Sequence, residues 1–543
     1  MAVENPKMWY NMYQGEMSDR LAQSVFSVRS AESIPELANM IFNFPLSLIK
    51  QSLAEGKSIR NILKETGEDW TQYIGTLRTY QTVGTAFMYC SPRSMIGDGV
   101  GLGKTAEISG LLNFLRLKNK LGRFLMAVET SAIGQTQLEL TKFTGMRVVI
   151  LPSESTPMQK MIARTDWGTV DGIVIKHSTL KSDTFMNWLA KYIGEDGKLK
   201  LFNTFILDES SVIKNNTTKI YEYTSNICKL VDRVHFMNAT SFESNIMDIY
   251  YQMDMMNPNM LPKESKFKNK YCTWERVYFW KTVGSGKNRK PEMQSRWSMS
   301  GYKNQAEFKE SLKLVYLGRS QKQVGLEGEN IYKVYTVQPT PAMTQAIAKG
   351  YRYPEVCNCP SLLPEIKIGM NRKEVPKLNR LCEIVENDCV DTNVVIYCFN
   401  VEAQKAIKKE LEALGRKCVI LNGEGSTGAK KDEETLDKVI AFNNGEYDVF
   451  ITNKQRSLNL HSADVLIMYS ASATVGKLEQ IRGRIDRHVD DRVKTFILLL
   501  YEGTGEFDLM ANTAKQRGQD SRDLILDAET AIDRFIAALE GEE

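Results

Sequence analysis

Short apolar runs of strand length occur in two separate blocks of this 543-residue chain, and amphipathic stretches lie between the runs. The first block holds the runs 124–128, 148–151, 172–175 and 205–207. The second block holds the runs 394–397, 418–421, 449–451, 465–468 and 496–500. Alternating strands and helices are typical of a parallel sheet wrapped by helices. We therefore expect an α/β fold with two tandem parallel-sheet lobes.

The segment between the two blocks differs in composition. Residues 263–303 contain eleven Lys or Arg and three Glu, which gives a net charge of +8. Aromatic residues are interleaved with these charges, among them Phe267, Tyr271, Trp274, Tyr278, Phe279, Trp280 and Trp297. Residues 284–288 predict a flexible loop within the segment. Pro354, Pro360 and Pro364 follow and predict a linker before the second lobe.

These changes in composition divide the chain into six parts. We expect a mostly helical accessory region at 1–74, a first lobe at 75–262, a basic aromatic insertion at 263–345, a linker at 346–373, a second lobe at 374–518 and a C-terminal helix at 519–543.

The overall composition predicts a globular protein of the cytoplasm. Hydrophobic residues make up 42% of the chain and charged residues 25%. The sequence contains no apolar run of the roughly 18 to 20 residues that span a bilayer, and residues 1–14 lack a secretory pattern. Nine scattered cysteines predict reduced, mostly buried thiols. We expect a monomer without membrane contact.

A glycine-rich stretch at 98–105, DGVGLGKT, predicts a phosphate-binding loop that leads into a helix. Backbone N–H groups can converge on phosphate oxygens where no Cβ atom intervenes, which is the contribution of Gly99, Gly101 and Gly103. The helix N-terminus adds its positive dipole end. Lys104 would pair with the β and γ phosphates, and the Thr105 hydroxyl would bind Mg²⁺. An ordinary glycine turn before a helix is the alternative, and Asp98 stands where the common pattern has glycine.

Two carboxylates follow the apolar run 205–207 directly. At the carboxyl end of a buried strand they would face a ligand in the crevice of the sheet. Asp208 would hold Mg²⁺, and Glu209 would polarise the attacking water as a general base. A solvated strand end is the alternative interpretation of this pair.

A third cluster lies at 480–487, QIRGRIDR. Arg484 and Arg487 are three residues apart and would share one helix face. Planar guanidinium groups suit a γ-phosphate whose charge spreads during transfer. A surface helix with Asp486 as an ion-pair partner is the alternative.

Together these motifs resemble the superfamily-two helicases, and specifically the Swi/Snf-type DNA-dependent ATPases, from about residue 77 to 505. Residues 77–84 resemble the family's adenine-reading motif, 98–105 its phosphate loop including the aspartate, and 208–215 its acidic box. Residues 237–241 resemble its coupling motif, and 301–320 its interlobe segment. The compact build and the ending of the 480–487 cluster look most like short viral or bacteriophage members and annealing-helicase relatives.

The resemblance implies two RecA-like lobes that hydrolyse ATP with Mg²⁺ in the cleft between them. It implies a catalytic set of Lys104, Asp208, Glu209, Gln480, Arg484 and Arg487. Gln81 would contact the adenine base beside the glycines, Lys104 and Thr105. Asn459 falls in a second-lobe position that commonly faces DNA.

Several residues depart from the family pattern. Ser211 replaces a histidine of the acidic box, so we expect an altered link between that strand and the coupling motif. Ala239 and Ser241 replace a glycine and a proline of the coupling motif. Residues 454–457 replace small residues near Asn459, which affects the DNA contacts expected there.

The basic insertion has two interpretations that the sequence leaves open. Lys287, Arg289 and Lys290 could neutralise phosphates while Trp274, Phe279 or Trp280 stacks on exposed bases at a junction. Alternatively, the insertion is a small hydrophobic protrusion whose lysines are solvated.

The leading hypothesis is a DNA-stimulated ATPase that translocates on duplex DNA, or that remodels, unwinds or reanneals branched DNA. An RNA-directed or transcription-linked ATPase is a second hypothesis. A clamp that binds nucleotide and DNA without turnover is a third. A clamp would need neither Glu209 as water activator nor the arginines of the 480–487 cluster.

Overall fold

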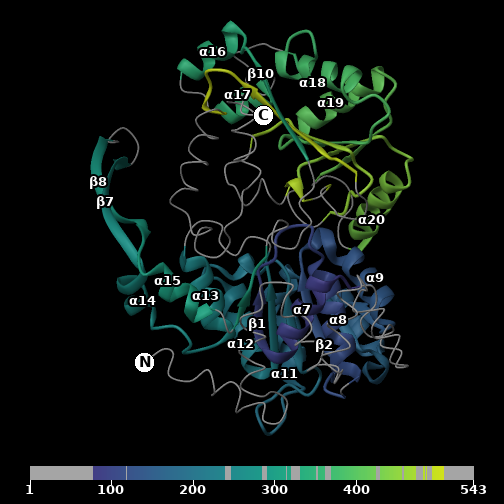
Figure 1. The fold of residues 1–543 in the computed structure, drawn as a ribbon, viewed down its shortest axis with the longest axis vertical. Coiled ribbons are helices and arrows are strands. Elements are labelled where there is room, and N and C mark those ends of the chain that lie inside the picture. Colours follow the sequence, from purple (N-terminus) through teal and green to yellow (C-terminus); the bar gives the residue numbers. More distant parts are fainter. Residues whose placement is uncertain are drawn as a thin grey trace, which may run out of the picture.

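The computed structural model describes residues 77–117, 119–238, 246–283, 290–312, 315–319, 330–349, 353–360, 369–422, 429–454, 458–471, 481–483, 485 and 492–506. The helices expected at 1–74 and 519–543 lie outside this set. Figure 1 shows the two described lobes, one above the other.

The first lobe is built on a seven-stranded sheet in the order β3-β4-β2-β5-β6-β1-β9. Its strands are β1 (Arg93–Ile96), β2 (Phe124–Val128), β3 (Val148–Ile150), β4 (Gly172–Lys176), β5 (Thr204–Leu207), β6 (Arg233–Met237) and β9 (Tyr316–Leu317). All neighbouring strands pair in parallel. Every residue of β2, β4, β5 and β6 is buried, as expected for a sheet covered on both faces.

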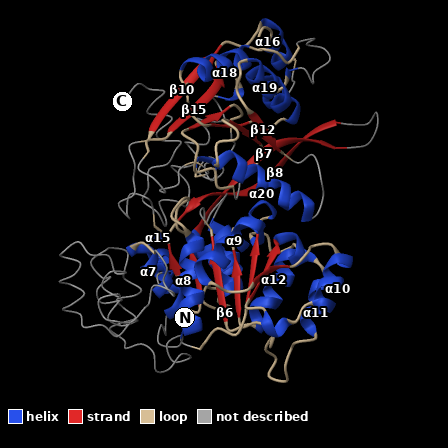
Figure 2. Cartoon of the chain, turned by 90° about the vertical axis from the view of Figure 1, so that its right-hand side faces the viewer, coloured by secondary structure: helices blue, strands red, loops and turns tan. Residues whose placement is uncertain are grey.

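Helices flank this sheet (Figure 2). They are α7 (Thr79–Cys90), α8 (Lys104–Leu117), α9 (Ile133–Thr144), α10 (Ser155–Arg164), α11 (Asp183–Ala190), α12 (Lys219–Leu230) and α13 (Ile246–Met256). Four short 3₁₀ helices connect them: η2 (Thr130–Ala132), η3 (Trp167–Thr169), η4 (His177–Lys181) and η5 (Ser210–Ile213).

The second lobe is built on a six-stranded sheet in the order β10-β15-β14-β11-β13-β12. Its strands are β10 (Ile331–Val337), β11 (Val394–Tyr397), β12 (Cys418–Leu421), β13 (Val449–Thr452), β14 (Val465–Met468) and β15 (Thr495–Tyr501). Its helices are α16 (Pro341–Ala348), α17 (Tyr353–Asn358), α18 (Pro376–Asn387), α19 (Val401–Ala413) and α20 (Ala429–Asn443).

The central strand β11 is buried on both faces, which accounts for the continuously apolar runs of the second lobe. Val394 and Ile396 belong to one buried cluster, and Val395 and Tyr397 belong to another. Successive side chains of a strand point to opposite faces, so both faces of this sheet are covered. The prediction of two tandem α/β lobes with parallel sheets is confirmed.

The insertion forms an antiparallel ribbon between two short helices. The order is α14 (Glu264–Tyr271), β7 (Cys272–Val283), β8 (Lys290–Tyr302) and α15 (Gln305–Leu312). Phe267, Tyr271 and Phe308 are buried in the core of the first lobe and hold the two helices there. Figure 1 shows the ribbon rising from these helices beside the two lobes.

The domain boundaries differ from those expected at 263–345 and 346–373. Strand β9 lies beside β1 in the first sheet, and β10 pairs with β15 over seven residues in the second sheet. The expected linker contains α17, in which Pro354 is the second residue and Cys357, three residues later, is buried. Proline is well tolerated in the first turn of a helix, so it did not mark a linker here.

The two lobes touch where α9 meets α20. A Cβ atom added to Gly134 of α9 would lie 3.5 Å from Cδ2 of Leu436 in α20. Eight of the nine cysteines have described side chains, and all eight are buried free thiols, as expected. Burial raises the pKa of the Cys398 thiol to about 12, so this thiol stays protonated and unreactive at neutral pH.

In the described ranges, we find no helix with both the length and the hydropathy that crossing a bilayer requires.

Candidate nucleotide site

The glycine-rich stretch forms the connection between β1 and α8, as predicted. Gly101 and Gly103 adopt φ values of +86° and +78°, a region that favours glycine. A Cβ atom on Gly103 would also lie 2.5 Å from Nε2 of Gln81. Helix α8 begins at Lys104, so its N-terminus follows the loop directly. The loop therefore combines close backbone approach with the positive end of a helix dipole.

Lys104 turns back onto the loop. Its Nζ donates to the carbonyl oxygens of Asp98 at 2.9 Å and of Gly99 at 3.4 Å. To pair with phosphate oxygens, the ammonium group would have to leave these two carbonyl oxygens.

Asp98 is fully buried and binds an arginine that is distant in the sequence. The backbone N–H of Arg319 donates to Oδ1 of Asp98 at 3.1 Å, and Nη2 donates to Oδ2 at 2.5 Å. The same Nη2 lies 2.7 Å from Oε1 of Glu107 in α8. The Arg319 side chain is only 3% exposed. This explains the aspartate in the loop: it anchors the loop to the end of β9.

Helix α7 belongs to the same buried network. Nη1 of Arg319 donates to the Tyr80 carbonyl oxygen, and its guanidinium carbon lies 5.3 Å from the centre of the Tyr80 ring. A Cβ atom on Gly84 would lie 2.3 Å from Oε2 of Glu107, so α7 packs tightly here. Burial raises the pKa of Glu107 well above its ordinary value, and the charge of Arg319 opposes this shift.

Gln81 lies against the loop and is almost entirely buried. Its Nε2 donates to the Leu102 carbonyl oxygen at 2.9 Å, and its Oε1 accepts from the Arg78 N–H at 2.9 Å. The Tyr80 hydroxyl donates to the same Leu102 carbonyl at 2.7 Å. Gln81 therefore links α7 to the phosphate loop, and its contact with adenine stays a prediction.

Asp208 and Glu209 follow β5 at the carboxyl edge of the same sheet. Oδ1 of Asp208 accepts from the Glu209 N–H at 3.0 Å. Glu209 has a left-handed backbone, with φ of +48° and ψ of +56°, which is unusual for a residue with a side chain. Strained backbone of this kind often occurs at functional sites, where the surrounding structure holds it in place.

The electrostatics of Asp208 connect it to the loop. Burial raises the pKa of Asp208, and the charge of the Lys104 ammonium group is the largest effect that lowers it. The Glu209 N–H acts in the same direction as Lys104, and the charge of Glu129 raises the pKa further. Lys104 therefore acts electrostatically on Asp208 across the carboxyl edge of the sheet.

Two residues of this edge escaped the sequence prediction. Glu129 follows β2, and His177 follows β4 and lies with Nε2 2.8 Å from the Asp208 carbonyl oxygen. Because a carbonyl oxygen only accepts, the His177 ring donates this hydrogen bond. Glu129 directly follows the apolar run 124–128, whereas Lys176 separates His177 from the run 172–175, so the sequence alone gives no sign that the two lie near Asp208.

The altered acidic box connects to α13. Ser211, which replaces the family histidine, is buried, and its neighbour Ser210 donates from Oγ to Oε1 of Gln252 at 2.5 Å. Gln252 in turn donates to the Asp248 carbonyl oxygen at 2.7 Å. Ala239 and Ser241 of the coupling motif lie outside the described residues, so the expected change in coupling stays a prediction.

The donor set around the loop suits Mg²⁺. Thr105 in the first turn of α8 and Asp208 would offer oxygen ligands, which this cation prefers, and substrate phosphates would complete its coordination. Within the described part of the chain, no group of three or more His, Cys, Asp or Glu side chains is arranged to hold a metal by itself.

Several predicted residues have no described side chain. Gln480, Arg484 and Arg487 lie outside the described residues, although Ile481 and Ile485 beside them are fully buried in the second lobe. Lys287 and Arg289 also lie outside. Trp280 and Lys290 are described as backbone positions of β7 and β8.

Asn459 lies between two anchoring side chains of the second lobe. Leu458 and Leu460 are buried in the core, and the Asn459 carbonyl oxygen accepts from Nδ2 of Asn443 at 2.8 Å. Asn459 is itself half-buried. Its contact with nucleic acid stays a prediction.

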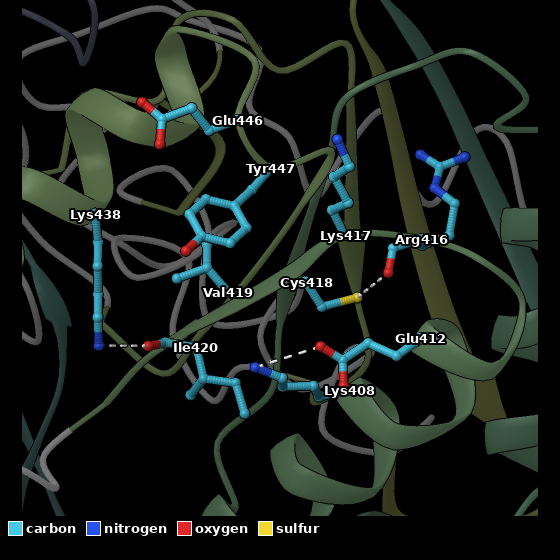
Figure 3. Close-up of a pocket in the computed structure, with 10 residues that line it drawn as sticks. All are labelled: Lys408, Glu412, Arg416, Lys417, Cys418, Val419, Ile420, Lys438, Glu446 and Tyr447. Carbon is cyan, nitrogen blue, oxygen red and sulfur yellow. Dashed lines mark hydrogen bonds and ion pairs between the residues drawn. The ribbon is translucent and has the colours of Figure 1, made fainter.

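A pocket of about 540 Å³ lies in the second lobe, at the edge strand β12 (Figure 3). Lys438 donates from Nζ to the Ile420 carbonyl oxygen at 3.1 Å and occupies part of this strand edge. Lys408 and Glu412 form an ion pair of 3.4 Å at the rim. No residue predicted to bind nucleotide lines this pocket.

Two family models match the chain. A SNF2-related domain matches residues 80–330, and a helicase conserved C-terminal domain matches residues 376–489. The two matches include the phosphate loop, the acidic pair and the 480–487 cluster.

Relatives are similar over part of the chain. The uncharacterized ATP-dependent helicase YqhH of Bacillus subtilis is 23% identical over 181 residues, which cover 33% of this chain and 29% of that protein. The human chromodomain-helicase-DNA-binding protein 7 is 24% identical over 204 residues, which cover 36% of this chain and 7% of that protein. The matches therefore span less than a third of the length of these two relatives.

The solved structure of Saccharomyces cerevisiae Dbp5 bound to RNA and ADP BeF3 has the same fold. It aligns over 83% of this chain and 88% of its own with a TM-score of 0.50 and 12% identity. With a first lobe that carries the phosphate loop and matches the SNF2-related domain, and a second lobe that matches the helicase C-terminal domain, the chain belongs to the Swi/Snf-type helicases of superfamily two.

Proposed function

We propose that this chain is a DNA-stimulated ATPase that translocates on duplex DNA, or that remodels branched DNA. The observation that carries this proposal is the meeting of three groups at one sheet edge. The glycine loop, Lys104 and the Asp208–Glu209 pair lie at the carboxyl ends of β1 and β5, and Lys104 acts on the pKa of Asp208.

The loop would bind the triphosphate through its backbone N–H groups and the first turn of α8. Lys104 would exchange the Asp98 and Gly99 carbonyl oxygens for phosphate oxygens, because an ammonium gains more from anionic oxygens than from neutral carbonyls. Gln81 would contact the adenine while its link to Leu102 couples α7 to the loop.

Thr105 and Asp208 would hold Mg²⁺, which when bound neutralises the charge on the β and γ phosphates. Glu209 would orient the attacking water and accept its proton. The left-handed backbone of Glu209 and the hydrogen bond from its N–H to Asp208 fix the backbone position from which the Glu209 side chain extends.

The second lobe would supply Gln480, Arg484 and Arg487 to the γ-phosphate. Buried Ile481 and Ile485 attach this segment to the core of the second lobe. The arginines would therefore move with that lobe, and closure of the interlobe cleft would complete the site.

DNA is the favoured nucleic acid, because the chain belongs to the Swi/Snf-type family and one relative is named a DNA-binding helicase. Asn459 would contact the strand from the second lobe. The fold also resembles a protein solved with RNA, which keeps an RNA-directed ATPase as the second candidate. We propose a monomer that acts in the cytoplasm, or in the host cytoplasm of a virus.

ATP hydrolysis measured with blunt duplex DNA, forked DNA, single-stranded DNA and RNA tests this proposal. We expect the largest stimulation with duplex or forked DNA. Stimulation by RNA alone would favour the RNA-directed ATPase, and ATP binding without any turnover would favour a clamp.

Two substitutions in the site sharpen this test. Lys104→Ala should abolish turnover, and Glu209→Gln should keep ATP binding while hydrolysis stops. Lys160→Ala and Glu154→Gln, which change exposed residues of α10 and its N-cap, are matched controls and should hydrolyse like the parent. Parental hydrolysis by Glu209→Gln would refute its assignment as the base.

A further inference from the structure

The β7–β8 ribbon has one aromatic face. In its register Trp274 pairs with Met299, Arg276 with Trp297, and Tyr278 with Ser295. Directly paired residues of antiparallel strands share a face, and alternate residues of each strand return to it. The same face therefore carries Trp274, Tyr278, Trp297, Met293 and Met299, together with Arg276.

This face is exposed to an unusual degree. Trp274 is 40% exposed, Tyr278 60%, Trp297 67% and Met293 55%. The ribbon has only two strands, and in Figure 1 it stands apart from the two lobes. A cluster of exposed large apolar side chains normally marks a binding surface, because the free energy falls when each of them is removed from water.

The opposite face carries more polar residues and fewer aromatic ones. Its paired positions include Glu275 with Ser298, Val277 with Arg296, and Phe279 with Gln294, so two of these six residues are apolar. Glu275 and Arg296 are exposed, and Ser298 is half-buried. Aromatic side chains are therefore concentrated on one face of the ribbon. A ribbon with two faces open to solvent could have been polar on both.

The charge of the segment indicates the chemistry of the ligand. The eleven Lys or Arg against three Glu in 263–303 favour a polyanion. On the aromatic face itself, the Arg276 guanidinium lies 5.6 Å from the centre of the Tyr278 ring, and its Nε donates to the Ser295 Oγ at 2.9 Å. This contact holds a cation among flat rings, a combination that suits phosphates joined to bases.

We propose that the aromatic face of the ribbon binds unpaired nucleotides, with bases stacked on Trp297, Tyr278 and Trp274. In a duplex the bases already stack on one another, so these side chains can reach bases only in a single-stranded stretch. The ribbon would thus recognise the unpaired arm of branched DNA, which deepens the proposed function by naming the DNA structure that this chain prefers.

The base of the ribbon is firmly attached to the first lobe. The Lys303 N–H donates to the Tyr271 carbonyl oxygen at 3.0 Å, and Nδ2 of Asn304 donates to the Lys270 carbonyl oxygen at 2.8 Å. The Phe267 and Phe308 rings lie 5.5 Å apart, edge to face, in the lobe core. Nucleotides held on the ribbon would therefore be carried with the lobe that binds ATP.

The experiment measures binding of labelled DNA by fluorescence anisotropy at one salt concentration. Its three DNAs are a single strand, a fork with unpaired arms and a blunt duplex. The test variant is Tyr278→Ala with Trp297→Ala. The control, Gln294→Ala with Ser298→Ala, alters the opposite face and also keeps the charge. Stacking contributes about 1–3 kcal/mol per base, so we expect affinity for the single strand and the fork to fall about 10-fold or more.

Blunt-duplex affinity and duplex-stimulated hydrolysis should stay at the parental level in the test variant, which also reports that the protein is folded. The ring-preserving variant Tyr278→Phe with Trp297→Phe should restore most of the lost affinity. Parental affinity of the alanine variant for the single strand would overturn the proposal. So would a parental protein that self-associates in sedimentation and becomes monomeric in the alanine variant without losing DNA affinity.

This binding assay is independent of turnover. If the parent protein binds the single strand through these rings but no DNA stimulates hydrolysis, the proposed function fails and the ribbon proposal stands. If duplex DNA stimulates hydrolysis but the alanine variant binds all three DNAs like the parent, only the ribbon proposal fails.

Discussion

Asp98 shows how one residue can depart from a common motif and still serve it. Glycine at this position would leave Arg319 without its main partner in a buried setting. The carboxylate of Asp98 accepts hydrogen bonds from the backbone N–H, Nε and Nη2 of Arg319, and Glu107 accepts a further one from Nη2. The sequence placed Asp98 in the loop but gave no sign of its partner, because 221 residues separate the two.

This network leads to a prediction for Arg319→Ala. Removing the guanidinium leaves two buried carboxyl groups without their cation, and loss of one partner from a buried ion pair costs about 3–5 kcal/mol. We expect the free energy of unfolding, measured by urea denaturation, to fall by about that amount. Arg164→Ala at the exposed end of α10 is the control and should cost below about 0.5 kcal/mol. A loss of less than about 1 kcal/mol for Arg319→Ala would contradict the role assigned to this residue.

At the scale of elements, continuous apolar runs could be predicted and strands with polar residues could not. The runs at 124–128, 205–207 and 394–397 became β2, β5 and β11. Strand β6 escaped because Arg233 and His235 interrupt its apolar pattern, although both are buried. Both side chains contact groups distant in the sequence, which a local pattern does not contain: the Arg233 guanidinium donates to the Tyr89 carbonyl oxygen, and Nδ1 of His235 lies 3.0 Å from the Ser94 Oγ.

The candidate site divides in the same way. The loop, Lys104 and the acidic pair follow local patterns, so they could be found from the sequence. Glu129 and His177 needed the strand order, because only neighbouring carboxyl ends bring them to Asp208. The aromatic face of the ribbon needed the register, since one shifted residue would have placed Trp297 with the polar side.

His235 gives strand β6 a pH-dependent contribution to stability. Its Nδ1 lies 3.0 Å from the Ser94 Oγ in the neighbouring strand β1, and its ring is fully buried. Burial, followed by the charges of Arg233 and Arg93, lowers its pKa well below the ordinary value. The unfolded chain therefore takes up a proton below about pH 6.5 that the folded chain does not.

We therefore expect the free energy of unfolding to decrease as the pH falls below about 6.5, with a contribution from His235 of about 1.4 kcal/mol per pH unit. His235→Gln keeps a hydrogen-bonding side chain that does not titrate. The difference between the parent and this variant, measured by urea denaturation from pH 7.5 to 5, should shrink as the pH falls. A constant difference across this range would contradict the shift.

At the scale of the whole molecule, the route of the chain connects the nucleotide loop to the passage between lobes. Arg319 directly follows the edge strand β9, and the Gly99 N–H donates to its carbonyl oxygen at 2.8 Å. The next described strand, β10, already belongs to the second sheet. The chain thus leaves the first lobe from a residue that is bonded to the phosphate loop, and a change in this loop would act directly on the interlobe connection.

The predicted site residues are divided between the two lobes, so neither lobe should be sufficient for catalysis. The first lobe carries the loop, Lys104, Asp208 and Glu209, whereas Arg484 and Arg487 follow Ile481 in the second lobe. ATP affinity should therefore reside mostly in the first lobe, and the rate of hydrolysis should require both lobes.

Single-turnover ATP hydrolysis by Arg484→Ala with Arg487→Ala, at saturating duplex DNA and with ATP affinity measured in parallel, tests this claim most directly. We expect ATP affinity to stay within a few-fold of the parent and the hydrolysis rate to fall on the order of 10³-fold. Arg492→Ala, which removes an exposed ion pair with Asp464 in the same lobe, should hydrolyse like the parent. Parental hydrolysis by the double variant would contradict an active site completed by the second lobe.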